Sequence, residues 1–170
     1  MTPPSQPPAD LLTAYRHGLL NHYVHQTGVL AARLESFPEA AQHRPLAPEE
    51  WSPHQVIWHV HAVEMQAYLP RLVRLLEASE PLLADFDGEA WMAEQYTSSE
   101  SCASIVARVR EARQEMRSRL EQAPVAAWAR TGFHSYWGTR TVMWWVERSI
   151  GHVDEHARQL KGGSSASPTT

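Results

Sequence analysis

The segment Ile150–Leu160, IGHVDEHARQL, carries two histidines four positions apart, His152 and His156. Its pattern predicts a helix, and at about 3.6 residues per turn this spacing stacks both imidazoles on one helix face. Two imidazoles on one face can bind the same metal ion. They can equally be two histidines at the edge of a hydrophobic core. A third ligand elsewhere in the chain would decide between these interpretations and would also restrict how the helices are arranged.

A second segment bears on this choice, and it opens at residue 51 with WSPHQVIWHVHAVE. Ser52 suits a helix N-cap and Pro53 suits the first helical position, so the sequence predicts a helix that continues to about Ser79. Pro70 lies inside this helix and is expected to kink it. Apolar residues occur almost all round the helix, which indicates that it is buried on most sides.

This helix offers three histidines as the third ligand, His54, His59 and His61. His59 stands among valines, where an imidazole is costly to bury unless it has a partner. His61 has Glu64 three residues further on, which supplies a local hydrogen-bond or ion-pair partner. The sequence therefore favours His59.

Three further segments have helical periodicity, so the sequence predicts an all-α fold, most simply a four-helix bundle. They are residues 9–36, 99–122 and 139–161. Residues 80–98 form a long connection between the second and third helices, and no segment alternates for long enough to predict a strand. On the third helix, Arg113 and its charged neighbours are expected to face solvent, whereas Cys102 lies on the apolar stripe.

The positions of the histidines along their helices predict the topology of the bundle. His59 is about 10 Å from the start of the second helix, and His152 and His156 are roughly 8–14 Å from the end of the fourth. The three imidazoles lie at the same height along the bundle axis only if the second and fourth helices are antiparallel. A simple up-down-up-down topology would make these two helices parallel. Residues 80–98 can reach about 60 Å when extended, enough to cross the bundle and give an up-down-down-up topology.

Composition and charge argue against several classes of protein. The chain has 170 residues and is 43% hydrophobic, which suits one domain, expected at residues 9–161 between disordered tails at 1–8 and 162–170. Fourteen arginines and one lysine are spread among the acids and the net charge is −4, so nucleic-acid binding is not expected. No apolar run predicts a membrane span and no signal peptide is recognisable. Together with a single cysteine, these features favour a cytoplasmic protein.

Two histidine-containing blocks, WSPHQVIWHVHAVE and GHVDEHARQL, together with the pair Phe86-Asp87, resemble the DinB/YfiT-like superfamily of proposed metalloenzymes. The resemblance covers about residues 9–161 and implies an up-down-down-up four-helix bundle that is often dimeric. Carried over residue by residue, it makes His59, His152 and His156 the metal ligands. It also implies a small-molecule substrate, because some relatives are thought to be metal-dependent hydrolases and others transfer low-molecular-weight thiols such as bacillithiol or mycothiol.

Three imidazoles leave at least one coordination position of a metal open, as in a catalytic site. Zinc or nickel suits such ligands best, and iron or manganese is the second choice. Glu64 is the candidate general base, and its alternative role is to pair with His61 or Arg71. Because Cys102 is expected to be buried, a thiol reaction would need a thiol cosubstrate.

The expected function is therefore that of a metal-dependent enzyme, either a low-molecular-weight thiol S-transferase or a hydrolase in stress or detoxification. The expected assembly is a homodimer. The alternative is a non-catalytic helical dimer in which the metal is structural or absent.

Overall fold

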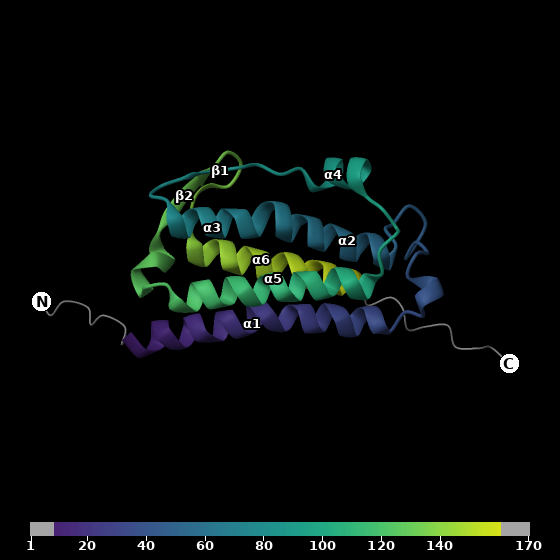
Figure 1. The fold of residues 1–170 in the computed structure, drawn as a ribbon, viewed down its shortest axis with the longest axis horizontal. Coiled ribbons are helices and arrows are strands. Elements are labelled where there is room, and N and C mark those ends of the chain that lie inside the picture. Colours follow the sequence, from purple (N-terminus) through teal and green to yellow (C-terminus); the bar gives the residue numbers. More distant parts are fainter. Residues whose placement is uncertain (1–8, 161–170) are drawn as a thin grey trace, which may run out of the picture.

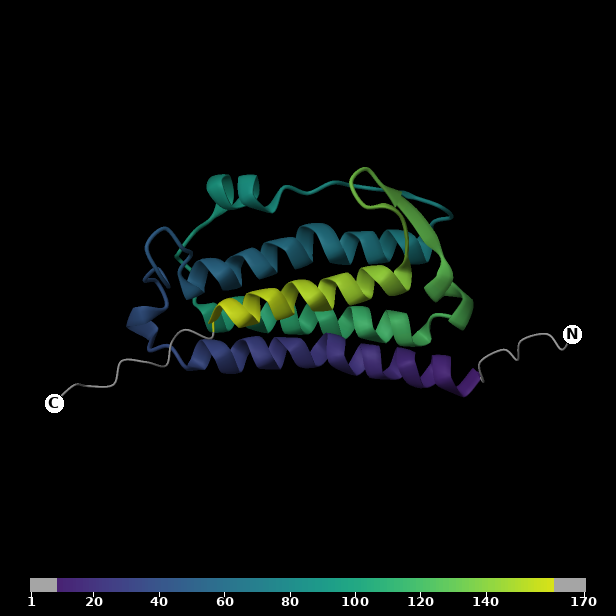
Figure 2. The same ribbon diagram turned by 180° about the vertical axis from the view of Figure 1, so that it is seen from behind.

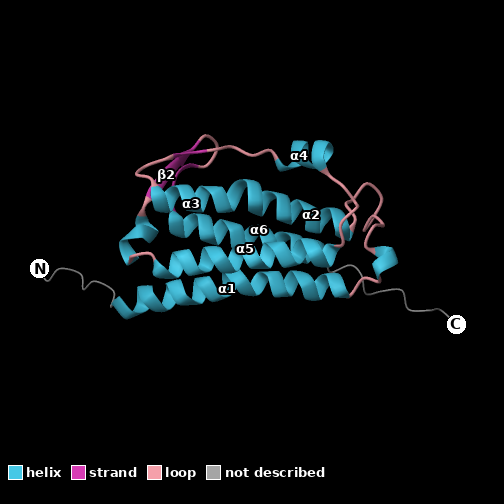
Figure 3. Cartoon of the chain, in the orientation of Figure 1, coloured by secondary structure: helices cyan, strands magenta, loops and turns pink. Residues whose placement is uncertain are grey.

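Four helical rods lie side by side in the computed structural model, which describes residues 9–160 (Figures 1 and 3). The first rod is α1, Ala9–Glu35, and the third and fourth are α5, Cys102–Gln122, and α6, Val142–Gln159. The second rod consists of α2, Pro53–Val63, the π-helix Glu64–Tyr68, and α3, Leu69–Glu77, which follow one another without a break. The disordered tails expected at 1–8 and 162–170 lie outside the described residues.

Both rods that carry the candidate ligands begin at a side-chain cap. Ser52 Oγ accepts a hydrogen bond from Gln55 N, and the Gln55 side chain accepts one from Ser52 N, which forms a capping box directly before Pro53. Thr141 caps α6 by accepting a hydrogen bond from Trp144 N. These caps satisfy backbone donors that the first turn of a helix otherwise leaves unpaired.

Hydrogen-bonded pairs show the relative directions of the rods. Arg16 of α1 donates to the carbonyl of Ala123, whereas Tyr23, further along α1, accepts from Arg113, which lies earlier in α5. The two helices are therefore antiparallel. Figures 1 and 2 show α1 and α6 running one way and α2, α3 and α5 running the other. The chain between α3 and α5 returns along the outside of the bundle and contains α4, Gly88–Gln95.

A small sheet at one end of the bundle corrects the expectation that the chain has no strand. Strand β1, Leu82–Leu83, pairs in parallel with β2, Thr131–His134, and β2 pairs in antiparallel fashion with β3, Gly138–Thr141. Strands of two to four residues are too short for alternation to be recognised in a sequence. Gly132 permits the close approach of β1, because a Cβ there would lie 2.9 Å from the Pro81 carbonyl oxygen. The four-helix bundle is confirmed, but the fold is not purely helical.

Buried apolar side chains fill the bundle in two clusters. One cluster contains Leu72 and Trp145, and the other contains Ile57 and Val153. Cys102 belongs to the second cluster and is 2% exposed, as its place on the apolar stripe predicted. Within residues 9–160, no helix has both the length and the apolar character that crossing a membrane requires.

Candidate metal centre

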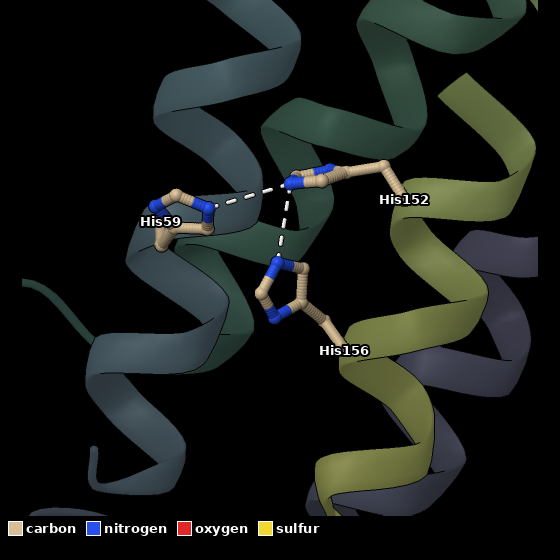
Figure 4. A group of neighbouring side chains, drawn as sticks. All are labelled: His59, His152 and His156. Atoms are coloured by element: carbon tan, nitrogen blue, oxygen red, sulfur yellow. Dashed lines mark hydrogen bonds between the residues drawn. The ribbon is translucent and has the colours of Figure 1, made fainter. Parts of the chain in front are cut away.

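Three imidazoles from two rods face one another inside the bundle (Figure 4). His59 lies in α2, and His152 and His156 lie in the last turns of α6. Nε2 of His152 is 3.3 Å from Nε2 of His59 and 3.1 Å from Nε2 of His156. One ligand nitrogen from each ring lies within 4.8 Å of the other two. The three residues singled out in the sequence are thus brought together, and each is at most 9% exposed.

The common level of the rings follows from the antiparallel arrangement of α2 and α6. His59 faces His152 and His156, whereas Glu64, later in the second rod, is hydrogen-bonded to Ser149, which is earlier in α6. The two series of contacts run in opposite directions along the sequence. A parallel pair of helices would separate His59 from the other two rings.

The nitrogen spacing fits a metal ion. Two nitrogens at corners of a tetrahedron around zinc, with Zn–N about 2.0–2.1 Å, are roughly 3.3 Å apart. Nδ1 of His156 donates to Gln159 Oε1 at 2.8 Å, which leaves the lone pair of its Nε2 directed at the centre. Nδ1 of His59 and of His152 is buried without a hydrogen-bond partner in the part of the chain that the structure describes. The donor set therefore suits a divalent cation held by three Nε2 atoms.

Burial keeps these imidazoles neutral. It lowers the pKa of His59 to about 4 and, with the neighbouring charges of His156 and His59, lowers the pKa of His152 to about 2. The pKa of His156 is also lowered, chiefly by burial. Neutral imidazole is the form that binds a metal. The site can therefore accept a cation near pH 7 without first releasing protons.

We expect the metal-free protein to lose stability as the pH falls below about 6.5. Histidines of the unfolded chain take up protons near this pH, whereas His59 and His152 resist protonation in the folded state down to about pH 4 and 2. The unfolded state therefore binds more protons between pH 6.5 and 4, and linkage lowers the free energy of unfolding there. Urea unfolding at pH 7 and pH 5.5 measures this loss. The loss should be smaller in His152→Leu. An equal loss would contradict the attribution of this pH dependence to the buried histidines.

Glu64, the predicted general base, lies in the interior of the bundle. One carboxylate oxygen accepts a hydrogen bond from Tyr23 Oη at 2.8 Å. The other accepts from Arg113 Nη2 at 2.9 Å and from Ser149 Oγ at 3.0 Å. Both oxygens are thus engaged in a network that is closed to solvent, because the Glu64 side chain is 0% exposed. Its role as a base stays a prediction.

Arg113 is the partner of Glu64 that sequence reasoning placed on the surface. Its side chain is 0% exposed, although its charge predicted a solvated position. The missed signal is spacing: Arg113 lies three residues before the buried Met116 and so falls on the apolar stripe of α5. The expected partners of Glu64 were His61 and Arg71, and the ion pair with Arg113 replaces both.

Two cavities lie beside the centre, and His59 lines both. The first, of about 590 Å³, is also lined by Trp51 and Glu89, and we call it the Trp51 cavity. The second, of about 640 Å³, extends to Arg71 and Trp137, and we call it the Arg71 cavity. Glu89 lines the second cavity as well. A small molecule in either cavity would contact the candidate metal centre at His59.

Gly88 allows the start of α4 to pack against the centre. A Cβ at this position would lie 2.8 Å from Cε1 of His59 and 3.3 Å from Cγ2 of Val63. We expect Gly88→Ala to displace the imidazole, to weaken metal binding and to lower the free energy of unfolding by about 1–3 kcal/mol. Gly28→Ala is the control, because nothing lies within 4 Å of a Cβ there. Metal titration and urea unfolding of both variants measure the effects, and equal behaviour would contradict the expectation.

Comparison with known proteins gives a family and a shared fold. The sequence model of the DinB superfamily matches residues 22–160. YfiT from Bacillus subtilis, described as a probable metal-dependent hydrolase with an unusual four-helix bundle topology, has a TM-score of 0.70 at 16% identity, over 94% of this chain and 93% of that chain. TT2238, described as a four-helix bundle protein, has a TM-score of 0.60 at 22% identity, over 86% and 98%. No curated protein matches. At these identities the structural likeness shows the fold alone.

Proposed function

We propose that this chain, which belongs to the DinB superfamily, is a metal-dependent enzyme whose divalent cation is held by His59, His152 and His156. The observation that carries the proposal is the convergence of three buried imidazoles, with Nε2 atoms 3.1 and 3.3 Å apart, beside two cavities. Zinc or nickel suits such ligands best, and iron or manganese is the second choice. The description of YfiT as a probable metal-dependent hydrolase supports the same chemistry.

The up-down-down-up order of the four rods is part of this proposal. It requires the long connection after α3 to return the chain to the end at which α2 began (Figure 1). Helix α6 then runs antiparallel to α2, so that its last turns meet the early turns of α2. The topology of the bundle therefore determines whether the three histidines can meet.

The chemistry depends on an open coordination position. When bound, the cation supplies Lewis acidity that lowers the pKa of water or of a thiol. The chain holds the imidazoles neutral and limits water around them: the Trp51 ring lies 4.8 Å from that of His59, and the Tyr68 ring 5.6 Å from that of His152. Glu89 lines both cavities, so its carboxylate is a proton acceptor open to a substrate, whereas Glu64 is enclosed.

A thiol reaction would use a thiol from outside the chain. Cys102 is 2% exposed, and burial raises the pKa of its thiol to about 11. The reactive form is the thiolate, so this side chain is poorly suited to attack a substrate near pH 7. We therefore propose two reaction classes for the same centre: transfer of a low-molecular-weight thiol, such as bacillithiol or mycothiol, to an electrophile, or hydrolysis. Either would serve stress responses or detoxification.

Assays of the zinc- and nickel-loaded protein separate these classes. The substrates are a panel of electrophiles with and without added thiol, and a panel of esters and amides without thiol. We expect activity that falls about a hundredfold or more in His59→Ala and is retained in His61→Ala. Thiol-dependent activity identifies a transferase, and thiol-independent activity identifies a hydrolase. If the protein turns over neither panel when it is loaded with zinc, nickel, iron or manganese, the enzyme proposal fails. The non-catalytic helical dimer then takes its place.

The assembly and location of the protein are further parts of the proposal. We propose a homodimer that acts on a small molecule in the cytoplasm. Sedimentation equilibrium tests the homodimer directly, because a mass of one chain at micromolar concentration would exclude it. The net charge of −4 supports a small-molecule substrate over nucleic acid.

A further inference from the structure

We infer that the Arg71 cavity is an anion-binding subsite, in which the guanidinium of Arg71 pairs with an anionic group of the substrate. The inference rests on the proposed function in one respect, namely that the reacting end of the substrate lies at His59. The substrate class is an elongated organic anion, with a carboxylate, sulfonate or phosphate at one end and an apolar body.

The guanidinium of Arg71 is buried and held in place, but it is not neutralised. Its side chain lies against the ring of Trp145, with Cζ 4.8 Å from the centroid, and the residue is 7% exposed. Nε and Nη2 both donate to the carbonyl of Ala84, at 3.1 and 2.9 Å. Within residues 9–160, no carboxylate lies within 4.0 Å of it and Nη1 has no acceptor. Nη1 is not among the buried atoms that lack a partner, so it is open to the cavity, where an anion can bind it with a charge-assisted hydrogen bond.

The geometry of these bonds leaves one edge of the guanidinium free. Nε and Nη2 use one side of the planar group on Ala84, which leaves both N–H groups of Nη1 and the second N–H of Nη2. Two parallel N–H groups on such an edge match the two oxygens of a carboxylate, sulfonate or phosphate. Because Trp145 and Ala84 already fix the side chain, little rotamer entropy remains to be lost on binding.

The π-helix places Arg71 on the same face of the rod as His59. In a regular α-helix, twelve residues would put the two side chains about 120° apart. A π-helical turn takes up one extra residue, so the twelve steps act as about eleven, and the difference falls to about 20°. Both residues accordingly line one cavity. Their backbone positions are separated by about 17 Å along the helix axis. A ligand that reaches both must be elongated.

Aromatic side chains also line the Arg71 cavity. Tyr68, Phe86, Tyr136 and Trp137 contribute rings that suit an aliphatic or aromatic body. Two acids in the wall are already engaged. Asp85 accepts a hydrogen bond from Ser135 and lies 3.4 Å from His134 Nε2, and Asp87 caps α4.

Glu89 is the third acid in the wall of the Arg71 cavity, and its charge, like those of Asp85 and Asp87, opposes the entry of an anion. Burial lowers the pKa of Arg71, and the smaller influences of Tyr68 and Asp85 oppose this shift. The ion-pair partner of Asp85 is His134, at 3.4 Å, and Asp85 does not come within 4.0 Å of the Arg71 guanidinium.

The test is a matched pair of ligands, 4-phenylbutyrate and 4-phenylbutan-1-ol, which differ in charge but have similar size. Isothermal titration of the full chain after chelator treatment measures their affinities without any contribution from a bound metal. We expect the wild type to bind the carboxylate about tenfold more tightly than the alcohol. We expect Arg71→Gln to abolish that preference and Arg74→Gln, on the exposed face of α3, to retain it.

Arg71→Lys covers the case in which Arg71→Gln does not fold. Lysine keeps the charge but lacks the planar edge, so the preference should fall severalfold while circular dichroism reports a folded chain. Equal affinity of the wild type for the two ligands would overturn the inference, as would an unchanged preference in either Arg71 variant. Failure to bind metal or to turn over a substrate would instead overturn the proposed function and leave this result intact.

Discussion

Arg113→Leu lowers the free energy of unfolding by about 3–5 kcal/mol, which we expect to be the largest effect of any single substitution in the bundle. Arg113 and Glu64 form an ion pair at 2.9 Å in which both side chains are 0% exposed. Burial lowers the pKa of Arg113, but the charge of Glu64 raises it above its ordinary value. Without the guanidinium, the carboxylate of Glu64 stays buried with only hydroxyl donors, from Tyr23 and Ser149.

Urea unfolding at pH 7, followed by circular dichroism, measures this loss. Arg117→Leu is the matched control, because its ion pair with Glu121 is 3.8 Å long and partly exposed and should contribute less than about 1 kcal/mol. The double variant Glu64→Leu/Arg113→Leu should recover most of the loss, since it removes both charges together. A loss in Arg113→Leu no greater than that in Arg117→Leu would show that the buried charge is compensated in another way.

The long helices could be predicted from sequence because each presents several turns of one pattern. Apolar residues that recur every three to four positions over twenty or more residues predict α1 and α5 within a few residues of their observed ends. The sheet could not be predicted in this way. Leu82 and Leu83 form a strand only because Phe133 and His134 lie beside them, and this pairing joins segments about fifty residues apart. Such a contact depends on tertiary structure that local patterns do not contain.

The histidines of the candidate site could be predicted because their constraints are local. The spacing of His152 and His156 needs only a helix, and the burial of His59 needs only its apolar neighbours. The Glu64–Arg113 pair was missed because charged side chains were assigned to solvent by type rather than by position on the helix. The π-helix was missed for a different reason: no residue pattern marks it, although it changes which side chains of the second rod share a face.

Zinc at a hundredfold excess over its dissociation constant raises the free energy of unfolding by about 2.7 kcal/mol, provided that it binds only the folded chain. For a protein of this size, that corresponds to a rise in Tm of roughly 5–11 °C. We expect His152→Ala to abolish the rise. Its Nε2 lies 3.3 Å from Nε2 of His59 and 3.1 Å from Nε2 of His156. Without His152, only two ligand nitrogens remain at the site. Thermal unfolding with and without zinc, together with the metal content of the purified chains, measures both effects.

The metal-free forms distinguish a ligand from a structural residue. His152 carries a buried Nδ1 without a hydrogen-bond partner in the part of the chain that the structure describes, and that cost disappears with the side chain. The substitution also removes the contacts of Nε2 with His59 and His156, so the effect of zinc on His152→Ala is measured against that variant's own metal-free stability, and we expect no stabilisation. His61→Ala, outside the three-histidine group, should keep the full response to zinc. An unchanged response in His152→Ala would remove this residue from the metal site, because stabilisation by a ligand follows its affinity for the folded state.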